Sequence, residues 1–107
     1  MMRILLYKFW KRIHGTRISL SVALIGNSGI HIGDNCCIEP YCYLKSEKPN
    51  GILEIGNGVV IKRFSHISAK ESKVEIKNSG YIGYNNWIGG RGSITIGQNF
   101  MSGMNVV

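Results

Sequence analysis

Aliphatic residues recur at every sixth position along most of the chain. The spacing holds within successive sets, and a longer gap separates each set from the next. The members are Ile18 and Leu24; Ile32, Ile38 and Leu44; Ile55, Ile61 and Ile67; Ile76, Ile82 and Ile88; and Ile96, which opens a further set. A fixed period of this kind is typical of repeat architectures. Because the extra residues always enter at the same phase, the pattern indicates three short segments in each repeat unit.

Segments that each point one aliphatic side chain inward can close a triangular coil. The residue after the aliphatic one is often glycine, and turn-forming residues such as Asp34-Asn35 and Asn57-Gly58 come next. The fourth residue after each aliphatic also faces inward and is expected to be small. The residues at this position are Val22, Ser28, Cys36, Cys42, Val59, Ser65, Gly80 and Gly92, with Asn86 and Phe100 as departures. The sequence therefore predicts an all-β triangular solenoid over residues 15–107, with about four to five turns stacked at a strand spacing of about 4.8 Å.

The repeats resemble those of a known family. The segments IHIGDNCCIEPYCYL, LEIGNGVVIKRFSHI and SITIGQNFMSGMNVV are similar to the hexapeptide repeats of acyltransferases that form a left-handed parallel β-helix. The closer match is to members that O-acetylate sugars of capsule and lipopolysaccharide, and it covers about residues 17–107. The left hand of the coil is implied by this resemblance alone. Carbonic anhydrases of the γ class and sugar nucleotidyltransferases carry the same coil, so the repeat is more specific for fold than for function.

The family resemblance implies an acetyl-CoA-dependent O-acetyltransferase acting on a sugar or polysaccharide hydroxyl. It also implies a homotrimer that holds the acceptor and coenzyme A between neighbouring prisms. A non-catalytic β-solenoid that only assembles or binds partners is the alternative. The resemblance gives acetyl-CoA as a co-substrate and no metal.

Residues just before each inward aliphatic point outward and form one column on each face of the prism. The first column is polar and holds His31, Glu54, Glu75 and Thr95. The second column holds Arg17, Cys37, Val60, Tyr81 and Met101, and the third holds Ala23, Tyr43, His66 and Trp87. Rows of apolar and aromatic side chains usually mark contact surfaces. We therefore expect Val60, Tyr81, Met101, Tyr43, His66 and Trp87 to line a trimer interface, unless insertion loops fold over one of the two faces.

Acyl transfer needs a general base, which is a single histidine near a subunit interface in the family that this chain resembles. His31 falls on the polar column, and His66 is explained by packing between Tyr43 and Trp87. The family histidine follows a glycine-rich turn that "ITIGQNFMSGMNVV" matches, so the catalytic base is expected beyond Val107. His66 is the alternative base. The chain is accordingly expected to be a C-terminally truncated acyltransferase that is inactive alone.

The three cysteines favour a reduced setting. Cys36 and Cys42 occupy inward positions and Cys37 an outward one, and none forms a CxxC pair. The histidines also lack the converging pattern of a zinc site. A cytoplasmic protein without a bound metal is expected.

Residues 1–14 differ from the coil. Leu5, Leu6, Phe9, Trp10 and Ile13 fall on one helical face, with Arg3, Lys8, Lys11 and Arg12 around it. The segment therefore predicts an amphipathic helix. It either caps the coil or rests on anionic lipid, which would place the protein at the inner face of the membrane.

The chain carries a net charge of +7. Basic residues gather at the corner that receives the insertions: Lys45, Lys48, Lys70, Lys73 and Arg91. Such an edge is either solvated or attracts an anionic glycan or the phosphates of coenzyme A. Nucleic-acid binding is not expected, because no recognised motif is present and Glu47 and Glu71 interrupt the basic residues.

Overall fold

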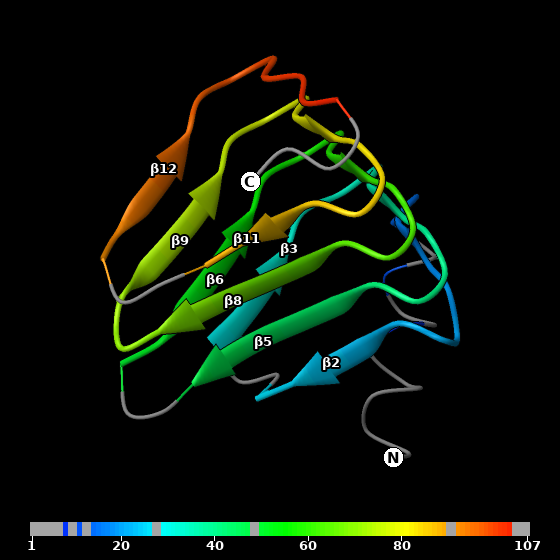
Figure 1. The fold of residues 1–107 in the computed structure, drawn as a ribbon. Helices are drawn as coiled ribbons and strands as arrows, with labels where there is room; N and C mark the ends of the chain where they lie inside the picture. The colour runs from blue at the N-terminus through cyan, green and yellow to red at the C-terminus, as the bar shows by residue number, and fades with distance from the viewer. Residues whose placement is uncertain are drawn as a thin grey trace.

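The structure is a computed structural model, which describes residues 8, 11, 14–26, 29–47, 50–89 and 92–103. Short strands run through these residues in a repeating order of three (Figure 1). The strands are β1 (Arg17–Ile18), β2 (Ala23–Ile25), β3 (Ile30–Ile32), β4 (Cys37–Ile38), β5 (Tyr43–Glu47), β6 (Ile52–Ile55), β7 (Val60–Ile61), β8 (His66–Lys70), β9 (Lys73–Ile76), β10 (Tyr81–Ile82), β11 (Trp87–Ile88) and β12 (Ile94–Ile96).

Each strand pairs with the strand three places earlier in the chain, which gives three four-stranded sheets. Sheet A has the order β1-β4-β7-β10, sheet B the order β2-β5-β8-β11 and sheet C the order β3-β6-β9-β12. All of the pairs are parallel. The protein is thus an all-β, three-sided parallel solenoid of about four turns, as the six-residue period predicts.

The predicted inward residues form the core. Leu44 is fully buried and pairs in register with Leu24 below and Ile67 above, and Ile38 pairs likewise with Ile18 and Ile61. The aliphatic residues of the last turn, Ile88 and Ile96, are only partly buried but still pack against this core. One column of aliphatic side chains from each sheet therefore fills the axis of the coil.

The inserted residues lengthen strands on one edge of the prism. β5 and β8 continue past their hexads and pair through Ser46↔Ala69 and Glu47↔Lys70, while β6 and β9 begin early and pair at Ile52↔Lys73. The extension adds a second row of inward side chains, including Leu53, Val74 and Ala69, all fully buried. The insertions therefore lie together between sheets B and C, as predicted, and they enlarge the core there.

Glycine after the inward aliphatic residue permits close stacking of successive turns. A Cβ on Gly83 would lie 2.6 Å from the carbonyl oxygen of Gly103, and one on Gly33 would lie 2.6 Å from that of Gly56. The sharp bend itself falls later in the turn, where the backbone enters the left-handed region at Asn35, Gly58, Ser79 and Asn99. The glycines are thus needed for space between turns, and asparagine, serine or glycine makes the bend.

Small inward side chains at the corners tie each turn to the next. The Thr16 hydroxyl donates to the carbonyl of Gly33 at 2.7 Å, and the Ser65 hydroxyl donates to that of Gly83 at 2.9 Å. The thiols of Cys36 and Cys42 face the carbonyls of Gly56 and Lys62 in the same way, at 3.0 and 3.1 Å. Cys36 and Cys42 are therefore core residues, as their positions in the repeat predict.

The predicted helix of residues 1–14 lies mostly outside the described residues, but two of its lysines are described. Lys8 is 5% exposed, and its ammonium donates to the carbonyls of Ser19, Leu20 and Val22 at 2.8–3.2 Å. Lys11, which is equally buried, pairs with Asp34 at 3.4 Å. Burial lowers the pKa of Lys8. The ammonium groups of both lysines therefore contact the coil.

Candidate functional site

The outward column of sheet B stacks three rings. Tyr43, His66 and Trp87 occupy paired positions on β5, β8 and β11. The Tyr43 and His66 ring centroids lie 4.5 Å apart, and those of His66 and Trp87 lie 5.7 Å apart. Tyr43 and His66 are half-buried, while Trp87 is 49% exposed. The spacing of the sequence therefore placed these residues correctly on one face.

His66 is held as a neutral ring by this environment. Burial against the neighbouring rings, and to a lesser degree the positive charge of Lys45, lowers the pKa of His66 below its ordinary value of 6.5. In the described part of the chain, the His66 side chain makes ring contacts and no hydrogen bond. A neutral imidazole can accept a proton, but here it lacks the carboxylate or carbonyl that usually orients a catalytic histidine.

The lowered pKa of His66 makes stability depend on pH. The unfolded chain binds a proton on this residue more readily than the folded one, so the free energy of unfolding falls as pH drops below about 6.5 towards the folded-state pKa. The contribution is fully present above that pH. Urea unfolding of the wild type and of His66→Phe between about pH 7.5 and about pH 5 measures it. We expect the free energy of unfolding of His66→Phe to fall less over this pH range than that of the wild type. Equal decreases in the two proteins would contradict this expectation.

The outward column of sheet A is apolar over its upper part. Arg17, Cys37, Val60 and Tyr81 pair in register, and an isolated bridge adds Met101 above Tyr81. Cys37, Val60 and Tyr81 are half-buried, whereas Met101 is 77% exposed. The column of sheet C is polar by contrast, with His31, Glu54, Glu75 and Thr95 in register. Two of the three faces therefore carry apolar rows, as the sequence predicts.

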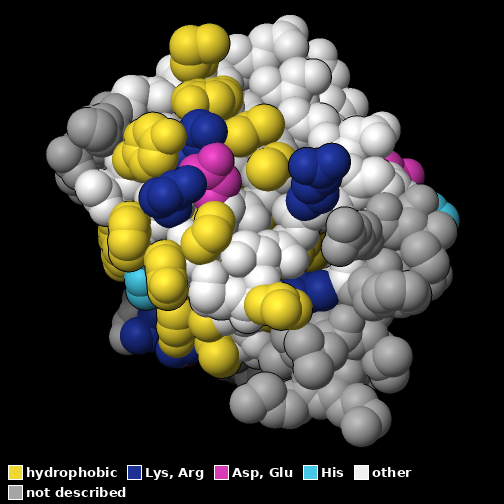
Figure 2. Space-filling model, turned by 90° about the vertical axis from the view of Figure 1, so that its right-hand side faces the viewer, with side chains coloured by type: hydrophobic (Ala, Val, Ile, Leu, Met, Phe, Trp, Pro, Cys, Tyr) yellow, Lys and Arg dark blue, Asp and Glu magenta, His cyan; other side chains and the backbone are white. Residues whose placement is uncertain are grey.

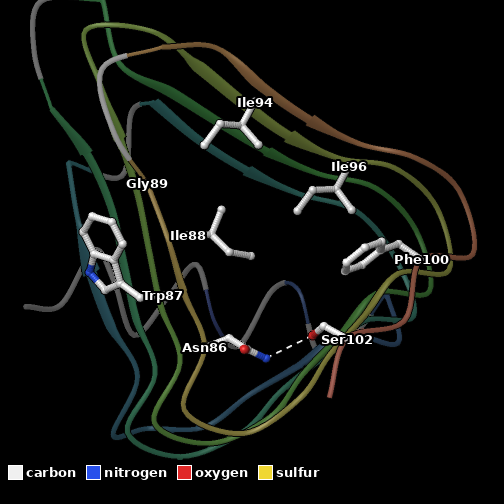
Figure 3. Close-up of a pocket in the computed structure, with 8 residues that line it drawn as sticks. All are labelled: Asn86, Trp87, Ile88, Gly89, Ile94, Ile96, Phe100 and Ser102. Atoms are coloured by element: carbon white, nitrogen blue, oxygen red, sulfur yellow. Dashed lines mark hydrogen bonds between the residues drawn. The ribbon is translucent and has the colours of Figure 1, made fainter. Parts of the chain in front are cut away.

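A cavity of about 310 Å³ opens at the C-terminal end of the described coil (Figure 3). Ile88, Ile94, Ile96 and Phe100 point into it, and Trp87 lies on the outer side of its strand. The Asn86 amide nitrogen donates to the Ser102 hydroxyl at 3.0 Å and to the carbonyl of Gly103 at 2.8 Å. The Asn86 Oδ1 atom is buried and has no partner among the described residues. The cavity therefore combines apolar walls with one unpaired hydrogen-bond acceptor.

The basic edge predicted at the inserted corner is partly neutralised. Lys45 and Lys70 both pair with Glu47, at 3.3 and 4.0 Å, and Lys73 pairs with Glu54 at 2.9 Å. The remaining members, Lys48 and Arg91, lie outside the described residues. Exposed ion pairs of this kind contribute little stability. They do reduce the positive potential that this edge could offer to an anionic ligand.

The thiols of Cys36 and Cys42 are buried in the core. Burial raises the pKa of Cys36 and Cys42, which keeps both thiols protonated and unreactive. Within the described residues, no three side chains of histidine, cysteine, aspartate or glutamate converge as metal ligands would. No helix in the same part of the chain has the length and apolar character needed to cross a membrane.

Comparison of this chain with protein-family models, with curated proteins and with solved structures found no match. The family resemblance therefore depends on the repeat itself, in its spacing and in the fold that the spacing predicts.

Some residues of interest escape the repeat pattern. Asn86 and Ser102 depart from the expected small and aliphatic residues, and together they make the core polar at the last described turn.

Glu39 accepts hydrogen bonds from Lys62 at 2.9 Å and from Arg63 at 3.4 Å, on the corner between sheets A and B. Tyr41 lies on the same corner. The sequence does contain a signal for this corner, because an aromatic residue stands at a bend where asparagine is usual.

Proposed function

We propose that this chain is part of an acetyl-CoA-dependent O-acyltransferase that acts on a sugar or polysaccharide hydroxyl. The proposal includes a left-handed coil and assembly as a homotrimer, with the columns of sheets A and B as contact surfaces. One observation carries it: the strand register follows the hexapeptide period at every outward column. That period is the feature on which the resemblance to the sugar O-acetyltransferases depends.

The chemistry of the proposed reaction is a simple acyl transfer. A neutral histidine takes the proton of the acceptor hydroxyl while the oxygen attacks the thioester carbonyl of acetyl-CoA. The C–S bond then breaks, the acetyl group remains on the sugar oxygen, and the proton passes to the thiolate of coenzyme A. The histidine returns to its neutral form. The apolar columns contribute the water-poor surface on which such a transfer avoids hydrolysis.

The base of this reaction is proposed to lie outside the described residues. Of the three histidines, His66 is packed between two rings, and His31 is exposed on the polar column beside Glu54. His14 is exposed near the first turn. None of these positions is an oriented base at an apolar cleft, and His66 comes nearest because of its lowered pKa.

A thiol-release assay with acetyl-CoA and a panel of sugars tests the proposal. It uses the 107-residue chain and any longer protein that contains this sequence. We expect no turnover from the 107-residue chain, because a general base contributes about 10²–10⁴-fold. In any form of the protein that shows turnover, His66→Gln should retain it. His31→Gln is the matched control on the polar face.

Two results would change this account. A loss of turnover of about 100-fold or more in His66→Gln, with the fold intact, would make His66 the base. No turnover from any form of the protein would instead favour a non-catalytic assembly or binding module. The ring stack around His66 favours that second function, because it uses the imidazole for packing and leaves it without a hydrogen bond in the described part of the chain.

Location at a membrane is part of the same proposal. A sugar acceptor linked to lipid would be reached from the cytoplasmic side, and residues 1–14 were expected either to cap the coil or to rest on anionic lipid. The burial of Lys8 and Lys11 against the coil favours the capping role for at least those two side chains.

A further inference from the structure

The corner between sheets A and B differs from the corner between sheets C and A. At the C–A corner the left-handed residues are Asn35, Gly58, Ser79 and Asn99, which tolerate that conformation. At the A–B corner Tyr41 and Phe64 take the equivalent position, with φ of 64° and 65°, and Asn85 takes it in the next turn with φ of 57°. A bulky aromatic residue with positive φ is a genuine outlier, and such strain is usually retained where it serves a function.

The strained residues present their rings to solvent. Tyr41 is 63% exposed and Phe64 is 55% exposed. The rings stack in parallel, with centroids 5.4 Å apart and planes within 9°. Asparagine at either position would relieve the backbone strain and expose less apolar surface. The fold therefore gains nothing evident from these two aromatic residues, which points to a role for their exposed surface.

Further apolar and charged side chains surround the two rings. Leu20, in the turn below, is 77% exposed, and Tyr84, in the turn above, is 37% exposed. Lys62 lies 5.5 Å from the Tyr84 ring centroid and also pairs with Glu39. Arg63 approaches the same carboxylate at 3.4 Å. Figure 2 shows this side of the molecule, where hydrophobic side chains gather around basic and acidic ones.

We name Leu20, Tyr41, Phe64 and Tyr84, with Lys62 and Arg63, the aromatic corner. Its apolar side chains are exposed at an outer corner of the prism, so it suits a broad surface better than an enclosed ligand. The parallel contact between Tyr41 and Phe64 occupies one face of each ring, so a sugar that stacks on these rings has only the other face of each to use. Aromatic side chains beside lysine and arginine match the interfacial region of a bilayer, where each ring has an apolar body among polar head groups.

The positive charge of the protein favours a bilayer that contains anionic lipid. Lys62 and Arg63 of the aromatic corner share a single carboxylate, that of Glu39, and the whole chain has a net charge of +7. A basic surface is attracted to anionic lipid by roughly 1 kcal/mol for each lysine or arginine near the head groups, which corresponds to about fivefold in affinity. The protein has positive charge and exposed apolar side chains on the same edge.

We propose that the aromatic corner is a membrane-docking edge, which inserts Leu20, Tyr41 and Phe64 among the head groups of an anionic bilayer. This edge is additional to residues 1–14, and it does not depend on acyl transfer. Lys8 binds the carbonyls of Ser19, Leu20 and Val22 at the lower end of this edge. These hydrogen bonds hold the turn that carries Leu20.

Cosedimentation with lipid vesicles tests the docking edge. The probes are vesicles of phosphatidylcholine alone and of phosphatidylcholine with phosphatidylglycerol, at low and high salt, over a dilution series of the protein. The test variants are Tyr41→Asn, Phe64→Asn and the double variant, which keep a residue that accepts positive φ. Ile52→Thr removes an exposed apolar side chain on sheet C and is the matched control.

We expect the wild type to bind the anionic vesicles and to lose at least half of the bound fraction at high salt. The double variant should bind at least tenfold more weakly while its melting temperature stays equal or rises, because asparagine relieves the strain. Ile52→Thr should bind as the wild type does. Equal binding by the double variant, or no binding by the wild type, would overturn the proposal.

Two further outcomes identify a different occupant. If the double variant changes the oligomer mass in light scattering, and the wild type does not bind vesicles, the aromatic corner is a contact between copies of this chain. If soluble anionic glycan binds to the wild type and not to the double variant, without vesicle binding, the corner is a glycan site. Either result would replace the membrane as the partner.

Discussion

The variant Leu44→Ala is expected to lose about 2–5 kcal/mol of unfolding free energy. Leu44 is fully buried at the axis, between Leu24 of the turn below and Ile67 of the turn above. Truncation leaves a cavity that the stacked turns cannot close, since hydrogen-bonded strands fix their spacing on both sides. A chain of this size has about 5–15 kcal/mol of stability in total, so the loss is a large share.

Urea unfolding followed by circular dichroism measures this loss, with Leu20→Ala as the matched control. Leu20 is the same residue type but 77% exposed on the aromatic corner, so its truncation should change stability by less than about 0.5 kcal/mol. If both variants lost similar stability, the inward register of the hexads would be wrong. A fold that depended on the corner instead of the axis would show the reverse order.

The six-residue spacing was enough to predict the fold and the faces of the prism. Each column inferred from sequence, such as Tyr43, His66 and Trp87, is a paired row in the structure. This worked because stacking one turn on the next forces residues of equal phase into register. The place of the insertions followed from the same rule. The hand of the coil did not follow, since a period is the same for either hand.

Other features depend on contacts that a period does not carry. The sequence placed Lys8 and Lys11 beside the apolar face of a predicted helix, and it did not show that their ammonium groups reach carbonyls and a carboxylate of the coil. A lysine stem is long enough to place its charge several ångströms from its own backbone, so its helical phase does not decide where the ammonium lies. The strand extensions at Ser46 and Ala69 were also missed, because the inserted residues were taken for loops.

The candidate site was only partly predictable for a related reason. The apolar columns could be found because they repeat. Tyr41 and Phe64 do not follow the turn chemistry of the other corner, so pattern reasoning passed over them. The unpaired Oδ1 atom of Asn86 likewise arises from three-dimensional packing at one turn. Residues that depart from the repeat cannot be predicted from its period, and substitutions at these positions test functions that the repeat does not explain.

The variant Val60→Asp is expected to convert the proposed trimer to a monomer. Val60 is half-buried in the column of sheet A, between Cys37 and Tyr81, where a partner would cover it further. An unpaired carboxylate buried at a contact is destabilising by about 3–5 kcal/mol, which weakens association by at least 100-fold. Light scattering coupled to gel filtration measures the mass. Thr95→Asp, on the polar column of sheet C, is the control and should leave the mass unchanged.

Trimer formation and membrane docking are expected to compete, because the aromatic corner lies between the columns of sheets A and B. Neighbouring copies that cover both columns would also restrict access to Tyr41 and Phe64, so a ligand that binds only the open corner should favour the separated chain. Val60→Asp is therefore expected to bind anionic vesicles at least as tightly as the wild type, and more tightly at protein concentrations where the wild type is trimeric. Weaker vesicle binding by Val60→Asp, with the fold intact, would mean that the membrane recognises the assembled form. A wild-type chain that is monomeric at all concentrations would refute the trimer. The docking edge would then be tested by the Tyr41→Asn and Phe64→Asn variants alone.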